Sequence, residues 1–212
     1  MSGPRIKICG INAAAALDAA IAVRADYAGL VFYPPSPRHL APPQAADLGT
    51  RAAGRIGAVG LFVDADDTTI GDAVGAARLQ ALQLHGSETP QRAAELRARF
   101  ALPVWKVISV ARARDVARAD IYAGAADLIL FDAKTPKGSL PGGMGLVFDW
   151  SLLARYRGAL PWGLAGGLSP DNVAEAVRVT GAPLVDTSSG VESAPGVKDV
   201  DKIAAFCKAA RQ

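Results

Sequence analysis

Two side chains near the ends of apolar runs are the first candidates for chemistry in this sequence. Cys9 lies in RIKICGI at 5–11, and Asp132 lies in DLILFDA at 127–133. Side chains alternate along a strand, so Lys7 and Cys9 would share one face of the first run. A thiol and a carboxyl that face each other across a pocket suit one general base and one general acid. The simpler alternatives are that Cys9 is a small buried hydrophobe and that Asp132 caps a helix or forms an ion pair.

Two glycine-rich turns near the C-terminus predict an anion site. AGGLSPDNV spans 165–173, and DTSSGVE spans 186–192. Backbone amides in such turns, together with a helix N-terminus, bind phosphate, and barrel enzymes often hold a phosphate between their last two loops. Ser169 would cap the helix after the first turn, with Pro170 at its first position. The candidate anion ligands are Gly166, Gly167, Ser188, Ser189 and Gly190, and plain tight turns are the alternative.

Three further polar residues are candidates for binding a substrate. Arg38 lies in the proline-rich loop PPSPRHLAPP, where its neighbours restrict the backbone, and a guanidinium held in this way binds a carboxylate through two parallel hydrogen bonds. A solvated loop arginine is the alternative. His85 shares a strand face with Gln83, and we expect it to form hydrogen bonds from the pocket wall. Asp186 is expected to point inward, where a structural pairing with Lys7 is the simpler role.

A regular alternation of elements would position these residues. The expected strands are short apolar runs at 5–11, 27–33, 55–64, 81–86, 103–110, 127–133, 161–167 and 183–190. The expected helices lie between and after them, at 13–24, 42–53, 67–77, 90–100, 112–122, 148–156, 170–179 and 200–210. Strict alternation favours a parallel sheet with helices outside, and eight units favour a closed barrel over an open sheet. The predicted fold is therefore α/β, one (β/α)8 TIM barrel with parallel strands, which forms a single catalytic domain over residues 1–212.

Composition and charge narrow the class of protein further. The 212 residues carry a net charge of +3 from scattered basic residues, which suits a small anionic substrate and not a nucleic acid. No apolar run reaches the roughly 18 residues of a membrane span, and no apolar signal region opens the sequence, so we expect a cytoplasmic protein. The 2 cysteines and 2 histidines form no metal motif. We therefore expect free thiols and neither metal nor cofactor.

Several motifs in a fixed order resemble one known family. They are KICGI at 7–11, SPR at 36–38, QLHG at 83–86, FDA at 131–133, GGMGLVFDW at 142–150, AGGLSPDNV at 165–173, DTSSGVE at 186–192 and GVKD at 196–199. On these motifs the chain resembles the phosphoribosylanthranilate isomerase family of tryptophan biosynthesis. The resemblance implies a (β/α)8 barrel that converts N-(5-phosphoribosyl)anthranilate to the corresponding 1-deoxyribulose phosphate. That reaction is an Amadori rearrangement and requires no metal or cofactor.

The resemblance also implies roles for individual residues. Cys9 would be the general base, Asp132 the general acid, and Arg38 the ligand of the anthranilate carboxylate, while the two glycine-rich turns would hold the phosphate. Lys7, close to Cys9, should favour the thiolate. The family commonly has a threonine where this chain has Met144, so this chain lacks a hydroxyl at that place.

Two other functions fit part of the sequence. The related isomerase of histidine biosynthesis, or an enzyme that accepts both substrates, would use two aspartates, and Cys9 stands against it. A non-catalytic barrel that binds a phosphosugar would keep the two turns but has no need of Cys9 together with Asp132. The sequence does not decide between a monomer and a homodimer.

Overall fold

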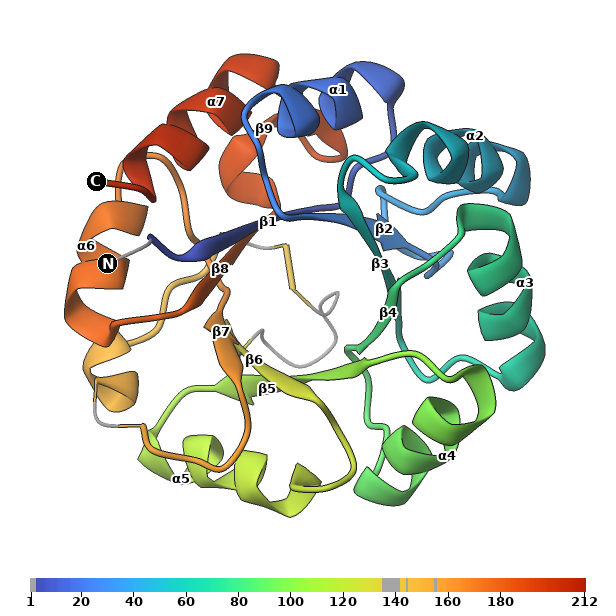
Figure 1. Ribbon diagram of the computed structural model, residues 1–212. Helices are drawn as coiled ribbons and strands as arrows, with labels where there is room; N and C mark the ends of the chain where they lie inside the picture. The colour runs from blue at the N-terminus through green and yellow to red at the C-terminus, as the bar shows by residue number, and fades with distance from the viewer. Residues whose placement is uncertain (1–2, 135–141, 144, 155) are drawn as a thin grey trace.

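Eight parallel strands close into a barrel in the computed structural model (Figure 1). The structure describes residues 3–134, 142–143, 145–154 and 156–212. The barrel strands are β1 (Arg5–Cys9), β2 (Tyr27–Val31), β3 (Gly57–Phe62), β4 (Ala81–Leu84), β5 (Val104–Val110), β6 (Leu128–Ala133), β7 (Trp162–Leu164) and β8 (Leu184–Thr187). They follow one another around the ring in chain order, and β8 pairs with β1 to close it. The predicted parallel (β/α)8 barrel is confirmed.

Helices form an outer ring around these strands, as Figure 1 shows. They are α1 (Ala14–Ala22), α2 (Pro42–Ala52), α3 (Asp67–Ala77), α4 (Pro90–Phe100), the short α5 (Ala113–Val116), α6 (Val173–Thr180) and α7 (Val200–Ala209). Local sequence signals set where they begin. The side chain of Asp66 accepts a hydrogen bond from the backbone of Thr69 at the start of α3, and Thr89 caps α4 ahead of Pro90.

Two apolar layers follow from the alternation of strand side chains. Ile6 and Ile8 are wholly buried in the layer between the sheet and the helices. The inward side chains at the N-terminal half of the barrel form a second, smaller core, in which Tyr27 meets Trp105 edge-on with ring centroids 4.9 Å apart. These apolar side chains fill the barrel interior toward the amino ends of the strands. The polar inward side chains therefore lie toward the carboxyl ends of the strands.

Two predicted helices are shorter than expected. The segment at 112–122 forms one α-helical turn, α5 (Ala113–Val116), followed by the 3-10 helix η1 (Ala117–Tyr122). Among its described residues, the segment at 148–156 forms one 3-10 turn, η2 (Trp150–Leu153). Aromatic packing replaces a helix there, because Tyr156 lies edge-on to Phe131 and Trp162 at centroid distances of 5.0 and 5.8 Å. The prediction of full helices at these two places is wrong.

The segments around β8 also differ from the prediction. Helix α6 begins at Val173 and not at Pro170, because the Asn172 side chain organises the preceding turn by bonding the backbone of Ser169 and Gly167 at 2.8 and 2.9 Å. Ser169 is therefore not its N-cap. After β8, the 3-10 turn η3 (Ser189–Val191) leads into a small antiparallel sheet of β9 (Glu192–Ala194) and β10 (Val197–Lys198). These strands are too short to show a hydrophobic period in the sequence.

Candidate active site

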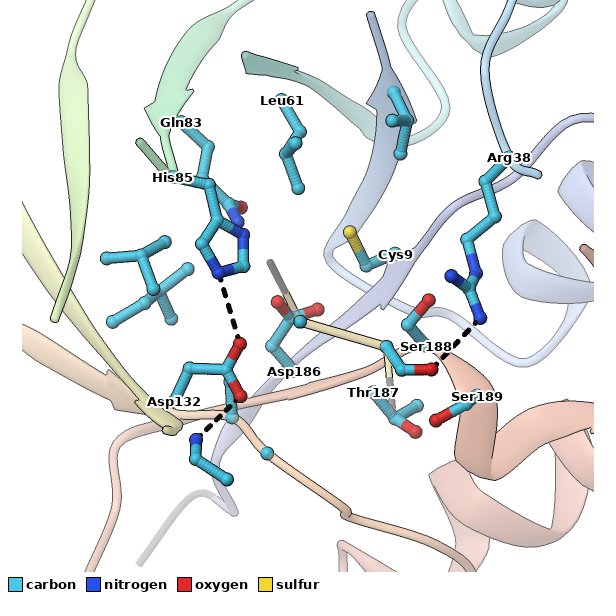
Figure 2. A pocket seen from close by; sticks show the side chains of 18 of the residues that line it. Cys9, Arg38, Leu61, Gln83, His85, Asp132, Asp186, Thr187, Ser188 and Ser189 are labelled. Atoms are coloured by element: carbon cyan, nitrogen blue, oxygen red, sulfur yellow. Dashed lines mark hydrogen bonds and ion pairs between the residues drawn. The ribbon is translucent and has the colours of Figure 1, made fainter. Parts of the chain in front are cut away.

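A cavity opens at the carboxyl ends of the barrel strands (Figure 2). Every strand, or the loop directly after it, contributes to its wall. Representative lining residues in ring order are Cys9, Val31, Leu61, Gln83, Val107, Asp132, Ala165 and Asp186. Barrel enzymes carry their active sites on this face of the ring. The open volume is small, about 70 Å³, and Gly142 and Gly143 of the segment after β6 help to line the cavity.

The two residues that the sequence singled out first both face this cavity. Cys9 ends β1 and is 5% exposed, while Asp132 comes from the end of β6 and is 6% exposed. Figure 2 shows the thiol and the carboxyl on different sides of the same space. Both side chains therefore belong to the wall of one cavity. A group that can accept a proton and a group that can donate a proton thus lie in a single buried site.

Asp132 is held by contacts to both carboxyl oxygens. Its Oδ1 accepts a hydrogen bond from the backbone N–H of Ala133 at 2.7 Å, and its Oδ2 lies 3.3 Å from Nε2 of His85. His85 is therefore a wall residue that touches the carboxyl. The Nδ1 atom of His85 and the Oε1 atom of Gln83 are buried and have no partner among the described residues. Both side chains line the cavity, so they offer hydrogen-bonding atoms to a ligand.

Lys7 lies beneath the cavity, between Asp186 and Cys9. The Lys7 Nζ atom is 3.1 and 3.0 Å from the two oxygens of Asp186, because the two residues are directly paired in the β1–β8 ladder. Lys7 is wholly buried and Asp186 nearly so. Burial alone would lower the pKa of Lys7, but the Asp186 carboxylate and the Cys9 thiol reverse this and hold that pKa above its ordinary value. A protonated Lys7 therefore lies next to the thiol.

Burial raises the pKa of the Cys9 thiol. The positive charge of Lys7 is the strongest opposing influence, and the negative charge of Asp186 adds to the rise. The prediction that Lys7 favours the thiolate is thus correct in direction. Desolvation nevertheless outweighs it, because taking a thiolate out of water costs more than one neighbouring cation returns.

Arg38 also lines the cavity, but one edge of its guanidinium is already occupied. Its Nε and Nη2 atoms each donate to a carboxylate oxygen of Glu192 at 2.7 Å, and the residue is only 8% exposed. The second cation on Glu192 is Lys198, at 2.6 Å. Arg38 is therefore no solvated loop residue. The sequence argument missed Glu192 and Lys198, although both lie inside motifs that it quoted, DTSSGVE and GVKD.

The two glycine-rich turns lie side by side at the cavity. Gly166 and Gly167 have φ angles of +85° and +63°, and both line the cavity with Ser188 and Ser189. Gly190 is not among the lining residues. A Cβ atom there would collide with the carbonyl of Leu168, so Gly190 allows the two turns to pack together. The hydroxyl of Thr187 joins them further, by donating to the same carbonyl at 2.6 Å.

The described ranges contain neither a metal-binding cluster nor a membrane-spanning helix. Within them, no three His, Cys, Asp or Glu side chains lie close enough together to hold a metal ion. None of the helices that the structure describes combines the length and the apolar character needed to cross a membrane.

Comparisons with known proteins point to one family. A family model described as N-(5'-phosphoribosyl)anthranilate (PRA) isomerase matches residues 6–209. The N-(5'-phosphoribosyl)anthranilate isomerase of Paramagnetospirillum magneticum is 57% identical over 207 residues, which are 97% of this chain and 96% of that protein. The crystal structure of phosphoribosyl anthranilate isomerase from Thermotoga maritima has a TM-score of 0.87 at 38% identity, with 98% of both chains covered.

A further solved structure of the same kind contains a ligand. It is a phosphoribosyl anthranilate isomerase in complex with reduced 1-(o-carboxyphenylamino)-1-deoxyribulose 5-phosphate, with a TM-score of 0.83, 35% identity and 98% of both chains covered. Fold and site together define the present chain as a (β/α)8-barrel enzyme with a buried thiol and carboxyl at its strand ends. The match of the family model over almost the whole length makes the assignment specific. The chain belongs to the N-(5'-phosphoribosyl)anthranilate isomerase family.

Proposed function

We propose that this chain isomerises N-(5-phosphoribosyl)anthranilate to 1-(2-carboxyphenylamino)-1-deoxyribulose 5-phosphate, the Amadori rearrangement of tryptophan biosynthesis. The observation that carries the proposal is the placement of the Cys9 thiol and the Asp132 carboxyl in one buried cavity. A barrel that only bound a phosphosugar would need no such pair. The isomerase of histidine biosynthesis would use an acid in place of Cys9.

Asp132 is the general acid in this proposal. Its protonated carboxyl gives a proton to the ring oxygen of the ribose, the C1–O bond breaks, and the lone pair of the anthranilate nitrogen forms a C=N bond to C1. The contacts from Ala133 and His85 fix the rotation of the carboxyl group, so that its proton is oriented toward the ring oxygen of the substrate. The resulting iminium acidifies the neighbouring C2 proton.

Cys9 is the general base. Its thiolate removes the C2 proton, the electrons of that C–H bond form a C1=C2 bond, and the C=N electron pair returns to nitrogen. The enolamine then tautomerises to the ketone. Protons move between the substrate and the two side chains, and electron pairs move within the substrate with no net oxidation, so the chemistry itself calls for no cofactor. Burial raises the pKa of the thiol, and the positive charge of Lys7 opposes this rise and so increases the fraction of thiolate.

The other predicted site residues bind the polar groups of the substrate. Arg38 takes the anthranilate carboxylate with the N–H groups that Glu192 leaves free. The turns at 166–167 and 188–190 take the phosphate with backbone amides and serine hydroxyls, and Gly190 serves by keeping these turns in contact. His85 offers its Nδ1 atom, unpartnered among the described residues, to the substrate from the cavity wall. Asp186 is also a predicted substrate-binding residue, and both of its oxygens already accept hydrogen bonds from Lys7.

Three further expectations accompany this proposal. We expect the enzyme to work in the cytoplasm, where the thiols of Cys9 and Cys207 would stay reduced; both are free and buried. We expect either a monomer or a homodimer. Met144, which replaces the common threonine, lies outside the described residues, and its expected packing against the anthranilate ring stays a prediction.

The test is an activity measurement on the purified chain. Freshly prepared N-(5-phosphoribosyl)anthranilate is added, and its anthranilate fluorescence is followed while the product is identified by an unchanged mass at a different retention time. We expect conversion by the natural sequence and almost none by Cys9→Ser or Asp132→Asn. A barrel that binds the phosphosugar without converting it would refute the proposal.

A further inference from the structure

The antiparallel pair β9–β10 lies against the loop that carries Arg38. Gly196, at the turn between the two strands, has a φ of +80°, and a Cβ atom there would lie 2.6 Å from the carbonyl oxygen of Pro37. The same turn accepts a hydrogen bond from the Asn12 side chain at 2.9 Å. The small sheet is therefore anchored to the loops after β1 and β2. Its two ends, Glu192 and Lys198, are paired in the ladder and project into the interior.

The Glu192 carboxylate is surrounded by donors. Its Oε1 accepts from Nε of Arg38 at 2.7 Å and from Nζ of Lys198 at 2.6 Å. Its Oε2 accepts from Nη2 of Arg38 at 2.7 Å and from the backbone N–H of Gly196 at 3.3 Å. Only 4% of the side chain is exposed. These hydrogen bonds and the two cations hold the pKa of Glu192 below its usual range in spite of burial, so the group is an anion.

This arrangement leaves one defined end of Arg38 for a ligand. Glu192 takes Nε and one side of Nη2, and the remaining donors are those of Nη1 and the outer side of Nη2. The outer side of Nη2 donates to the backbone carbonyl of Gly143 at 3.4 Å, a contact that a ligand carboxylate would have to replace, and a Cβ atom at Gly143 would lie 2.5 Å from Nη1. Arg38 and Gly143 both line the cavity, so the end of the guanidinium that points away from Glu192 lies at the cavity (Figure 2).

The second cation extends the same contact network to the anion-binding turns. Lys198 donates to the backbone carbonyl of Ser188 at 2.9 Å, and its side chain is 1% exposed. Ser188 lines the cavity on the β8 side. One buried carboxylate is thus bonded to the arginine on one side of the cavity and, through Lys198, to the turn after β8. Arg38, Glu192 and Lys198 together carry one positive charge.

We propose that Glu192 is a positioning residue that sets the orientation of Arg38 toward the carboxylate of the substrate. The inference rests on the proposed function, because it takes the anthranilate carboxylate as the group that Arg38 holds. Glu192 itself touches no substrate. Its effect is on where the two remaining N–H edges of the guanidinium point, and therefore on carboxylate recognition alone.

The experiment compares two unreactive ligands that differ by one group. One is reduced 1-(2-carboxyphenylamino)-1-deoxyribulose 5-phosphate, and the other is the same molecule with an unsubstituted phenyl ring. Dissociation constants are measured by calorimetry for the natural sequence, Glu192→Gln and Glu192→Asp. Glu175→Gln is the matched control, since it breaks an exposed Glu–Arg pair with Arg178 on α6, away from the cavity. Thermal unfolding of each variant checks the fold.

We expect Glu192→Gln to weaken the carboxylate ligand by about tenfold to a hundredfold and the phenyl ligand by less than about threefold, given the usual strength of charge-assisted pairs. Glu192→Asp keeps the charge, but its side chain is one methylene shorter and its carboxylate cannot reach both nitrogens of Arg38 from the same backbone position, so it should lose carboxylate preference as well. It also serves as the test if the Gln variant does not fold. Glu175→Gln should match the natural sequence for both ligands.

Three outcomes would overturn the inference and leave Glu192 as a structural ion pair. They are equal weakening of both ligands, no weakening of either ligand, and a normal preference for the carboxylate in a folded Glu192→Asp variant. Failure of the proposed function looks different. In that case the natural sequence itself would bind neither ligand, or would bind both without preference for the carboxylate.

Discussion

Replacing Lys7 by methionine tests how the base is kept usable. The change removes the charge at Nζ and keeps a chain of similar length in a wholly buried place. Lys7 opposes the burial that raises the pKa of the Cys9 thiol, so its loss should raise that pKa further. Each unit of such a rise lowers the thiolate fraction at neutral pH about tenfold. The rate should fall, and the ascending limb of the pH–rate profile should move to higher pH.

The same substitution also costs stability, and this effect must be separated from the first. Removing one partner of a buried ion pair leaves the other charge unpaired and typically costs about 3–5 kcal/mol. Here the partner is Asp186, whose two oxygens would lose a donor at 3.0–3.1 Å. The double variant Lys7→Met with Asp186→Asn leaves no unpaired charge and should recover much of the stability. It should not restore the pH profile, because Lys7 acts on the Cys9 thiol more strongly than Asp186 does.

Three measurements decide the matter. Urea unfolding gives the free energy of unfolding of each variant, the rate as a function of pH gives the ascending limb, and the pH dependence of Cys9 alkylation reports the thiol directly. A double variant that is stable and has the pH profile of the natural sequence would refute the reasoning. Lys7 would then be a structural partner of Asp186 only, which is the simpler role that the sequence also allowed.

Further substitutions give sharp expectations for the other site residues. Cys9→Ser and Asp132→Asn should fold normally and lose about 10²–10⁴-fold in kcat, measured by the fluorescence assay, and near-normal turnover would remove either residue from the mechanism. Arg38→Ala should raise KM by about one to two decades with little change in kcat, since the carboxylate is present in ground and transition states alike. Gly143→Val should be severely impaired, because φ is +67° there and a Cβ atom would lie 2.5 Å from Arg38. At the neighbouring position, Met144→Thr should change kcat/KM by less than about tenfold, or about 1.4 kcal/mol. If steady-state kinetics show a severe defect for Met144→Thr and none for Gly143→Val, the backbone geometry of this segment is not what matters.

The strand pattern was sufficient to predict the barrel and the face of the barrel that carries the site. In β1, alternation placed Lys7 and Cys9 inward and the two isoleucines outward, and the structure shows this arrangement. Such inference works because a strand has only two faces, and one of them must be buried against helices. It fails for the helix at 148–156, where edge-on packing of Tyr156 on Phe131 and Trp162 decides the local structure.

Partners of charged residues could not be predicted in the same way. The pairing of Lys7 with Asp186 depends on the closure of the ring between β1 and β8, which brings together residues far apart in the chain. Glu192 meets Arg38 only because a two-residue and a three-residue strand fold back over the loop after β2. The only local signal is the Pro-Gly dipeptide in ESAPGVK, which indicates a turn but not where it docks.

The charges of the site follow one physical constraint. A site for an anion needs cations at its wall, yet a buried cation without a partner costs several kcal/mol whenever the site is empty. Three buried cations of the described residues have carboxylate partners here, Asp186 for Lys7 and Glu192 for Arg38 and Lys198. The pairing leaves donors of Arg38 at the cavity and keeps Lys7 beside the thiol. Substitution of either carboxylate should therefore reduce stability and function together, even though neither carboxylate reacts.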